Sequence, residues 1–293
     1  MKKVAILYIA LGRYIVFWKD FYESCEKFLG ACEKHYFVWT DNKTFDFSEN
    51  KNVTVIPAVK KGWPFDTLLR FDMFLQKADE LKQFDYIYFF NANMQFIAPT
   101  DLSEIAPHDW HNGLVAGIHP GRDGDIDATN PDKFRYERRP ESTAYIPFGG
   151  GKYYVCGAFN GGTSEAYLKM CKTLSQNIQT DLEKNIIACV DDESHLNAYM
   201  ADKEFLVAGR AYGFPEAQLR KLNHTALPMV KIISRHKEHP KYGGNRWLRG
   251  QTDKKAPNNW ATIHLLIPAC KIISVFIPIR KYRRAVKNYF GSC

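Results

Sequence analysis

Apolar and polar positions alternate in blocks along the first hundred residues. Four short apolar runs have the length of buried strands, at 4–10, 35–40, 52–58 and 85–90. The segments 14–29 and 64–84, which lie between these runs, show the apolar spacing of amphipathic helices. Alternation of this kind predicts an α/β fold with a mostly parallel sheet. Ligands of such sheets bind beyond the carboxyl ends of the strands.

The second half of the chain is less regular. We expect strands at 113–119 and 204–209, and helices at about 164–188 and 191–202. The intervening chain is polar and then rich in glycine, which predicts turns at 149–151 and 161–163. Neither run of glycines is a P-loop, because no Gly-Lys-Ser/Thr follows. Glycine at 149–151 instead permits a positive φ or a close approach of the backbone to a ligand.

Composition and charge narrow the class of protein. The chain has 293 residues, of which 45% are hydrophobic, enough for one large α/β domain or a domain with an appendage. Its formal net charge of +8 suits a nucleic acid, an anionic membrane surface or a phosphorylated ligand. Because no nucleic-acid-binding motif is present, we expect no nucleic acid as partner. The 7 cysteines show no metal-binding spacing and are expected to be reduced thiols.

The composition changes after about residue 250, which predicts a domain at 1–250 and a tail at 251–293. The apolar run 263–279 is interrupted by Lys271 and two prolines, and a basic cluster follows it. This pattern favours a segment on an anionic membrane surface over a terminal helix docked on the domain's own core. Since 4–10 is read as a first strand and not as a signal peptide, we expect a cytoplasmic protein, peripheral at the inner face of the cell membrane.

Two stretches carry candidate chemistry. In DYIYFFNANMQF (85–96), an aromatic strand runs directly into Asn91-Ala92-Asn93. In DDESHLN (191–197), Asp191 or Asp192 is expected to cap a helix that places Glu193 in its first turn. Taken alone, the second stretch is more typical of a well-capped acidic helix than of a catalytic site.

A set of motifs occurs in a fixed order along the chain: LGRYI at 11–15, Trp63 with Arg70, the triplet at 91–93, HPG at 119–121, YERRPES and AYIPFG between 136 and 149, and DESHLN at 192–197. Their order and wording resemble glycosyltransferase family 6, from Val4 to Arg246. The resemblance implies a GT-A fold, a single nucleotide-diphospho-sugar transferase domain with a mixed central sheet flanked by helices. It also implies retaining transfer of galactose or N-acetylgalactosamine (GalNAc) from a UDP-sugar to the 3-hydroxyl of an acceptor galactose.

Roles for individual residues follow from the resemblance and, for the basic segment 230–249, from its positive charge. Glu193 is the expected catalytic carboxylate, acting either as a nucleophile or by stabilising an oxocarbenium-like state. The expected donor-binding residues are Ile9, Ala10, Leu11, Tyr14, Arg70, Asn91, Ala92, Asn93, Cys156, Gly157, Ala158, Asp191, Asp192, Lys231, Lys237 and Arg246. The expected acceptor-binding residues are His119, Arg135, Glu193 and Glu216.

The triplet departs from the vertebrate members, which carry Asp-Val-Asp and need Mn²⁺. A neutral amide pair is a poor anchor for a divalent cation, so we expect neither a metal nor another cofactor. The basic segment 230–249 is then expected to neutralise the diphosphate, with Lys231 as the leading residue. A solvated basic loop is the alternative.

The small side chains of Cys156 and Ala158 leave room for an N-acetyl group, which favours UDP-GalNAc over UDP-galactose. HPG matches the histo-blood-group A/B enzymes, so a fucosylated galactose is the expected acceptor. A UDP-galactose-dependent α-1,3-galactosyltransferase is the first alternative. A carbohydrate-binding protein without catalysis is the second.

Overall fold

The computed structural model describes residues 1–119, 130–221, 229–253 and 255. Two compact units divide the chain, Met1–His236 and Lys237–Cys293. In the second unit the described residues contain one short helix, α7 (Asn245–Leu248), whose first residue donates hydrogen bonds to the Glu238 carboxylate. The apolar and basic part of the tail lies outside the described residues, so its expected membrane contact stays a prediction. Among the described residues, no helix combines the length and the hydrophobicity needed to span a membrane.

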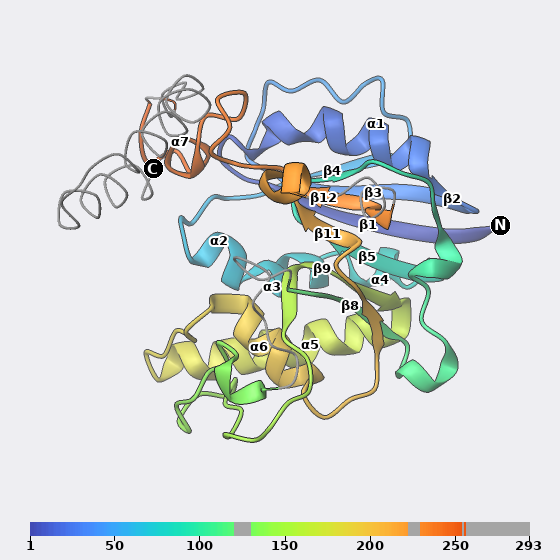
Figure 1. Cartoon of the computed structure of the whole chain (residues 1–293). Coiled ribbons are helices and arrows are strands. Elements are labelled where there is room, and N and C mark those ends of the chain that lie inside the picture. The colour runs from blue at the N-terminus through green and yellow to red at the C-terminus, as the bar shows by residue number, and fades with distance from the viewer. Residues whose placement is uncertain (120–129, 222–228, 254, 256–293) are drawn as a thin grey trace, which may run out of the picture. The chain divides into compact units, whose positions relative to one another are not determined.

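A mixed sheet of seven strands forms the centre of the first unit (Figure 1). The strands follow one another in the sheet as β10 (Leu206–Ala208), β8 (Leu114–Ile118), β9 (Val155–Thr163), β5 (Tyr86–Phe90), β1 (Lys2–Ala10), β3 (Cys32–Thr40) and β4 (Val53–Pro57). Only β9 runs antiparallel to its neighbours β5 and β8 among these described strands. The predicted mixed central sheet is confirmed.

Two smaller sheets and several helices complete this unit. The small sheets are β11 (Tyr212–Pro215) with β12 (Ile232–Ser234) and β6 (Met94–Phe96), and β2 (Leu29–Gly30) with β7 (Thr100–Asp101). The α-helices are α1 (Trp18–Phe28), α2 (Phe65–Leu68), α3 (Arg70–Leu75), α4 (Ala78–Leu81), α5 (Ser164–Glu183) and α6 (Asp191–Met200). Short 3₁₀ helices lie at Tyr14–Phe17, Leu102–Glu104, Asp109–His111, Pro131–Lys133 and Glu216–Lys221.

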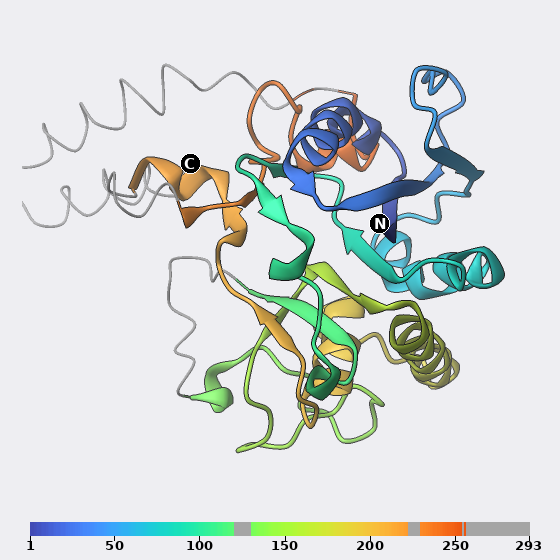
Figure 2. The same cartoon turned by 90° about the vertical axis from the view of Figure 1, so that its right-hand side faces the viewer.

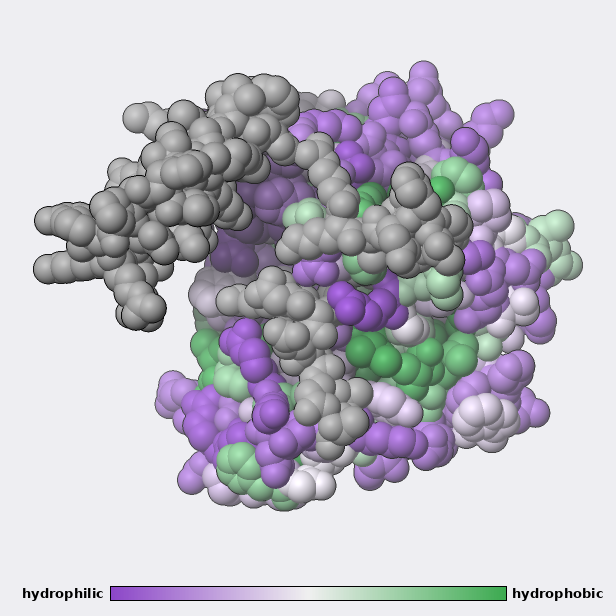
Figure 3. Space-filling model, in the orientation of Figure 1, coloured by the Kyte–Doolittle hydropathy of each residue, from purple (hydrophilic) through white to green (hydrophobic). Residues whose placement is uncertain are grey.

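Alternate residues of β1 face two hydrophobic cores, as expected for a strand buried on both faces. Ala5 and Leu7 belong to a core that includes Phe74 of α3. Ile6 belongs to a second core that includes Phe21 of α1. The sheet is therefore covered by α1 on one face and by α3 and α5 on the other (Figures 1 and 2). Among the residues coloured by hydropathy in Figure 3, most are hydrophilic, and a smaller hydrophobic area lies to the right of the centre.

The predicted helices in the first half are shorter than their apolar spacing indicates. The segment 14–29 begins as a 3₁₀ turn and becomes α1 only at Trp18. The segment 64–84 forms three helices, because the backbone leaves helical geometry at Leu69 and again at Lys77. One consequence of the first break is that Arg70 starts a helix of its own.

The predicted turn at 161–163 is wrong, since these residues belong to β9. The glycines are needed there because the neighbouring strands approach very closely. A Cβ atom on Gly161 would lie 2.3 Å from the Tyr88 ring, and one on Gly162 would lie 2.2 Å from the Gly113 carbonyl oxygen. The other predicted turn is confirmed, with a positive φ at Gly149 and Gly151.

The close approach at Gly162 predicts a stability defect. Replacing Gly162 with Ala forces a methyl group against the backbone of a neighbouring residue, and should lower the free energy of unfolding by about 1–3 kcal/mol. Urea denaturation measures this loss. The control is Gly209→Ala, because no atom lies within 4 Å of its added Cβ, and it should change stability by less than about 0.5 kcal/mol. Equal stability of the two variants would contradict the packing described.

Candidate active site

The Asn91-Ala92-Asn93 turn lies where β5 ends and connects it to β6. The backbone N–H of Asn91 donates to the Ala158 carbonyl at 2.8 Å, and the Tyr8 hydroxyl donates to the Ala92 carbonyl at 2.9 Å. The Asn91 side-chain oxygen accepts a hydrogen bond from the Ala92 N–H at 3.0 Å. These contacts attach the turn to both strands that flank β5.

The predicted uridine-binding residues lie at the same edge of the sheet. β1 runs parallel to β5, so the carboxyl ends of the two strands adjoin. Ile9 and Tyr14 are partly exposed there, whereas Ala10 and Leu11 are buried. The structure therefore places this group beside the 91–93 turn, as a strand-end site requires.

Helix α6 begins at Asp191, and its N-cap residue is Val190 and not an aspartate. Val190 occupies the N-cap position without a side-chain hydrogen bond, so the predicted Asp capping is wrong. The carboxylate of Asp192 instead forms an ion pair with the Arg70 guanidinium, at 2.7 Å.

Arg70 connects three parts of the site. It is only 4% exposed, and its Nη1 donates to the Gly157 carbonyl at 2.8 Å. Its guanidinium also lies 4.6 Å from the centre of the Phe89 ring, a favourable cation–π distance. Burial raises the pKa of Asp192 to about 6, while the positive charge of Arg70 opposes this shift.

Both carboxylate oxygens of Glu193 accept a hydrogen bond. The Tyr154 hydroxyl donates to Oε1 and the Gly157 backbone N–H donates to Oε2, each at 2.8 Å. Burial, and then the negative charge of Glu193, raise the pKa of Tyr154, so its hydroxyl stays a proton donor. A Cβ atom at Gly157 would lie 3.2 Å from an Asp192 oxygen, which favours glycine at this position. The carboxylate is thus held in one orientation.

Asn197 attaches the helix that carries Glu193 to the sheet. Its side-chain oxygen accepts from the Val155 N–H at 2.9 Å, and its Nδ2 donates to the Val155 carbonyl at 2.9 Å. The same Nδ2 donates to the Glu193 carbonyl at 2.8 Å. Asn197 therefore fixes the first turn of α6 against β9.

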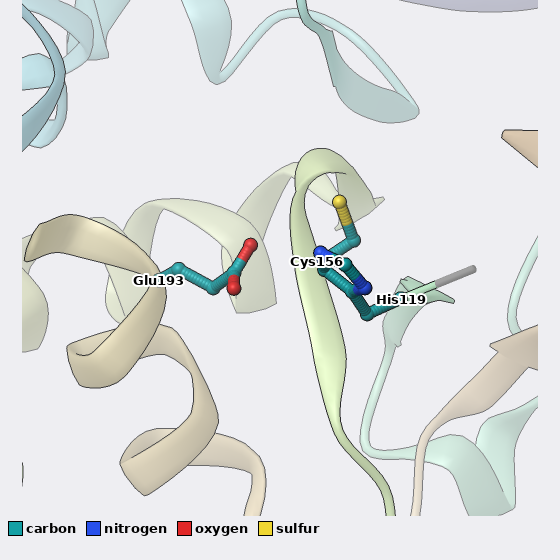
Figure 4. Close-up of side chains that lie close together, drawn as sticks. All are labelled: His119, Cys156 and Glu193. Carbon is teal, nitrogen blue, oxygen red and sulfur yellow. The ribbon is translucent and has the colours of Figure 1, made fainter. Parts of the chain in front are cut away.

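His119 and Cys156 lie beside this carboxylate (Figure 4). The His119 backbone N–H donates to the Tyr154 carbonyl at 2.9 Å. One side-chain ligand atom from each of His119, Cys156 and Glu193 lies within 4.8 Å of the other two. Residues expected to contact the acceptor, to select the donor and to catalyse transfer are thus brought together.

Comparison with known proteins identifies the family. The sequence model of glycosyltransferase family 6 matches residues 2–242. The chain belongs to glycosyltransferase family 6. The predicted family and the predicted GT-A fold are therefore confirmed. The protein is a hexosyltransferase. An enzyme of this kind requires a nucleotide-sugar donor and a glycan acceptor. A carbohydrate-binding protein without catalysis is set aside.

Several curated proteins are similar to this transferase. It is 36% identical to the O-antigen biosynthesis glycosyltransferase WbnI of Escherichia coli, over 83% of this chain and 98% of that protein. It is 26% identical to histo-blood group ABO system transferase 1 of Rattus norvegicus, over 77% of this chain and 66% of that protein. It is also 26% identical to globoside alpha-1,3-N-acetylgalactosaminyltransferase 1 of Mus musculus, over 84% and 68%.

The structure does not bring Lys231 to the other donor residues of the transferase. In the register of β12, Ser234 lies opposite Met94, which places Arg235 next to Asn93 and Lys231 about 13 Å farther along the strand. Lys231 pairs there with Glu104 at 3.3 Å. Arg235 is attached to Asn93 by two hydrogen bonds that involve its backbone, at 2.7 and 2.9 Å.

The remaining predicted residues have varied positions. Glu216 forms an ion pair with Arg235 at 2.9 Å, and therefore lies near the 91–93 turn. Arg135 is exposed, and its charge lowers the pKa of Tyr154, which places it near that residue. Lys237 and Arg246 belong to the second unit, and their donor contacts stay predictions.

The YERRPES segment (136–142) holds the chain that leads into α6. Its mixed charge did not indicate this role. Glu137 is 2% exposed and accepts two hydrogen bonds from the Arg139 guanidinium, at 2.9 and 2.6 Å. It also accepts from the Cys189 N–H at 2.8 Å, and Arg139 donates to the Ile187 carbonyl at 2.7 Å. These contacts hold the chain just before α6.

Tyr154 was also missed, although it alternates along the chain with Cys156 and Ala158 in the period of a strand.

The contacts of Glu137 predict a pH dependence of stability. Hydrogen bonds from Arg139 are the main cause that lowers the pKa of Glu137 from 4.5 to about 2. Its contribution to stability is therefore complete above pH 4.5 and is lost as the pH falls toward 2. Denaturant midpoints of the wild type and Glu137→Gln should differ most at neutral pH and converge in acid. A difference that stays constant between neutral pH and about pH 3 would contradict this role.

Proposed function

We propose that this transferase moves GalNAc from UDP-GalNAc to the 3-hydroxyl of a fucosylated galactose, with retention of the α configuration and without a metal ion. The observation that carries the proposal is the Glu193 carboxylate, which Tyr154 and Gly157 hold by both oxygens. A carboxylate fixed in this way can face a developing positive charge without reorganising. It serves equally well as nucleophile or as charge stabiliser, so both retaining routes stay open.

The donor sugar is proposed from the residues around that carboxylate. Cys156 and Ala158 are both partly exposed and small, which leaves space for an N-acetyl group. Similarity to a globoside N-acetylgalactosaminyltransferase supports the same choice. UDP-galactose is the second candidate, since a single pocket position changes selectivity by only about 1–3 kcal/mol. Similarity to an ABO system transferase supports a fucosylated acceptor.

The chemistry of the 91–93 turn supports metal independence. Neither amide carries a negative charge, and each already takes part in a hydrogen bond within the protein. This donor set does not fit Mn²⁺, which prefers carboxylate and water oxygens. Cationic side chains are therefore proposed to neutralise the departing UDP. Within the first unit, the backbone of Arg235 adjoins Asn93, and its guanidinium, which pairs with Glu216, is the cation proposed for this role.

The activity can be tested directly in the presence of a chelator. With UDP-GalNAc, 2′-fucosyllactose and excess EDTA, the wild type should form a trisaccharide-derived product carrying an α-1,3-linked GalNAc, detected by mass spectrometry and NMR. Lactose serves as the acceptor control and UDP-galactose as the donor control, and both should react more slowly. Activity that requires added Mn²⁺ would refute metal independence. Faster transfer from UDP-galactose would instead favour the second candidate.

Replacement of Glu193 tests its catalytic role. Glu193→Gln keeps the size and one hydrogen-bond acceptor but removes the charge, so the transfer rate should fall by at least about a hundredfold. UDP binding, measured by calorimetry, should be unchanged because the carboxylate faces the sugar and not the nucleotide. The control is Glu80→Gln, which removes a carboxylate from an exposed ion pair with Lys77. A Glu193→Gln variant with a near-normal rate would refute the role.

A further inference from the structure

The transfer reaction gives separate roles to His119, Cys156 and Glu193. It does not explain why their nitrogen, sulfur and oxygen atoms lie close together. His119 follows β8, Cys156 lies on β9 and Glu193 lies in the first turn of α6. Three separate elements thus contribute a nitrogen, a sulfur and an oxygen atom, all within 4.8 Å of one another. In Figure 4 the Glu193 carboxylate extends from its helix toward the strand that carries Cys156.

Imidazole, thiolate and carboxylate together are ligands of zinc and of similar thiophilic cations, and not of Mg²⁺ or Mn²⁺. Bond lengths of about 2.0 Å to nitrogen or oxygen and 2.3 Å to sulfur place tetrahedral ligands roughly 3.5 Å apart. Since the ligand atoms lie within 4.8 Å of one another, each pair would need to close by no more than about 1.3 Å. Three protein ligands leave a fourth tetrahedral position for water.

Several contacts already restrict the ligands. Tyr154 and Gly157 hold the Glu193 carboxylate, as second-shell groups orient metal ligands. The Ala158 N–H donates to the Cys156 sulfur at 3.4 Å, and the His119 backbone is held by the Tyr154 carbonyl. All three residues are partly exposed, so an ion can reach them from solvent.

We propose that these residues bind zinc or a similar thiophilic divalent cation, and that the bound ion inhibits sugar transfer. Binding releases the thiol proton of Cys156 to solvent as the sulfur–metal bond forms. The ion would then be coordinated by the Glu193 carboxylate and would fill the space beside it, so that the carboxylate could not act on the donor sugar. The inhibitory part rests on the proposed role of Glu193, whereas the binding part does not. A chelator should therefore raise the transfer rate of this protein, whereas it lowers the transfer rate of a metal-dependent transferase.

Cobalt substitution tests the site without an activity assay. One equivalent of Co²⁺ added to the purified wild-type protein should produce a thiolate-to-cobalt charge-transfer band and the visible bands of tetrahedral cobalt. Cys156→Ser should abolish the charge-transfer band. Cys189→Ser, which removes an exposed thiol outside the group, should retain it. Absence of the band in the wild type, or an equal band in Cys156→Ser, would overturn the proposal.

Zinc titration tests the consequence for transfer. Zn²⁺ should inhibit the wild type and EDTA should restore its activity, while Cys156→Ser should need about tenfold more zinc or higher for the same fractional inhibition. A cobalt spectrum with no zinc inhibition would overturn the inhibitory part and count against Glu193 as the reacting carboxylate. If no transfer is measured with either donor, the proposed function fails, and the cobalt spectrum still decides the metal site.

Discussion

The buried ion pair between Arg70 and Asp192 is the constraint on which the site depends. Both side chains are less than 10% exposed, so each charge needs the other. Removing one partner from such a pair typically costs about 3–5 kcal/mol, because the other charge is left buried and alone. The pair therefore joins the start of α3 to the start of α6. Since Arg70 also donates to Gly157, the same contact fixes β9 between the two helices.

Strand β9 gives the site its geometry. Its antiparallel course between β5 and β8 brings Gly157 next to the first turn of α6, where the backbone N–H reaches Glu193. Asn197 pairs with both backbone groups of Val155 and keeps the helix at that distance. Glycine at 161 and 162 allows the neighbouring strands to approach. The backbone of β9 thus orients the Glu193 carboxylate and the helix that carries it, a task that side chains perform at many other sites.

Sequence patterns predicted those parts of the fold in which local preference and tertiary structure agree. The apolar runs at 4–10 and 85–90 became β1 and β5, and DDESHLN began a helix as expected. The family motifs also indicated residues that the fold brings together, such as Arg70 with Asp192 and His119 with Glu193. The motifs could do so because they record which residues the family's chemistry needs, although they are far apart in the chain.

The errors share one physical cause, which is a partner distant in the sequence. The composition of 161–163 is that of a turn, but the packing of Tyr88 and Gly113 makes it a strand. Asp192 does not hold the predicted N-cap position, and its carboxylate pairs with Arg70, 122 residues earlier. Glu137 and Tyr154 were missed because the Cys189 N–H, which donates to Glu137, and the Glu193 carboxylate, which accepts from Tyr154, are both distant in the sequence.

The site therefore contains two kinds of polar group in different places, the amides of Asn91 and Asn93 and the carboxylate of Glu193. Neutral amides occupy the end of β5, and the carboxylate of Glu193 lies in the first turn of α6. The most direct measurement is a crystal structure of the Glu193→Gln variant with intact UDP-GalNAc. The account predicts the anomeric carbon next to the side chain at position 193, with the diphosphate beside Asn91 and Asn93 and without a bridging metal ion. A sugar bound away from that side chain, or a metal held by the two amides, would contradict it.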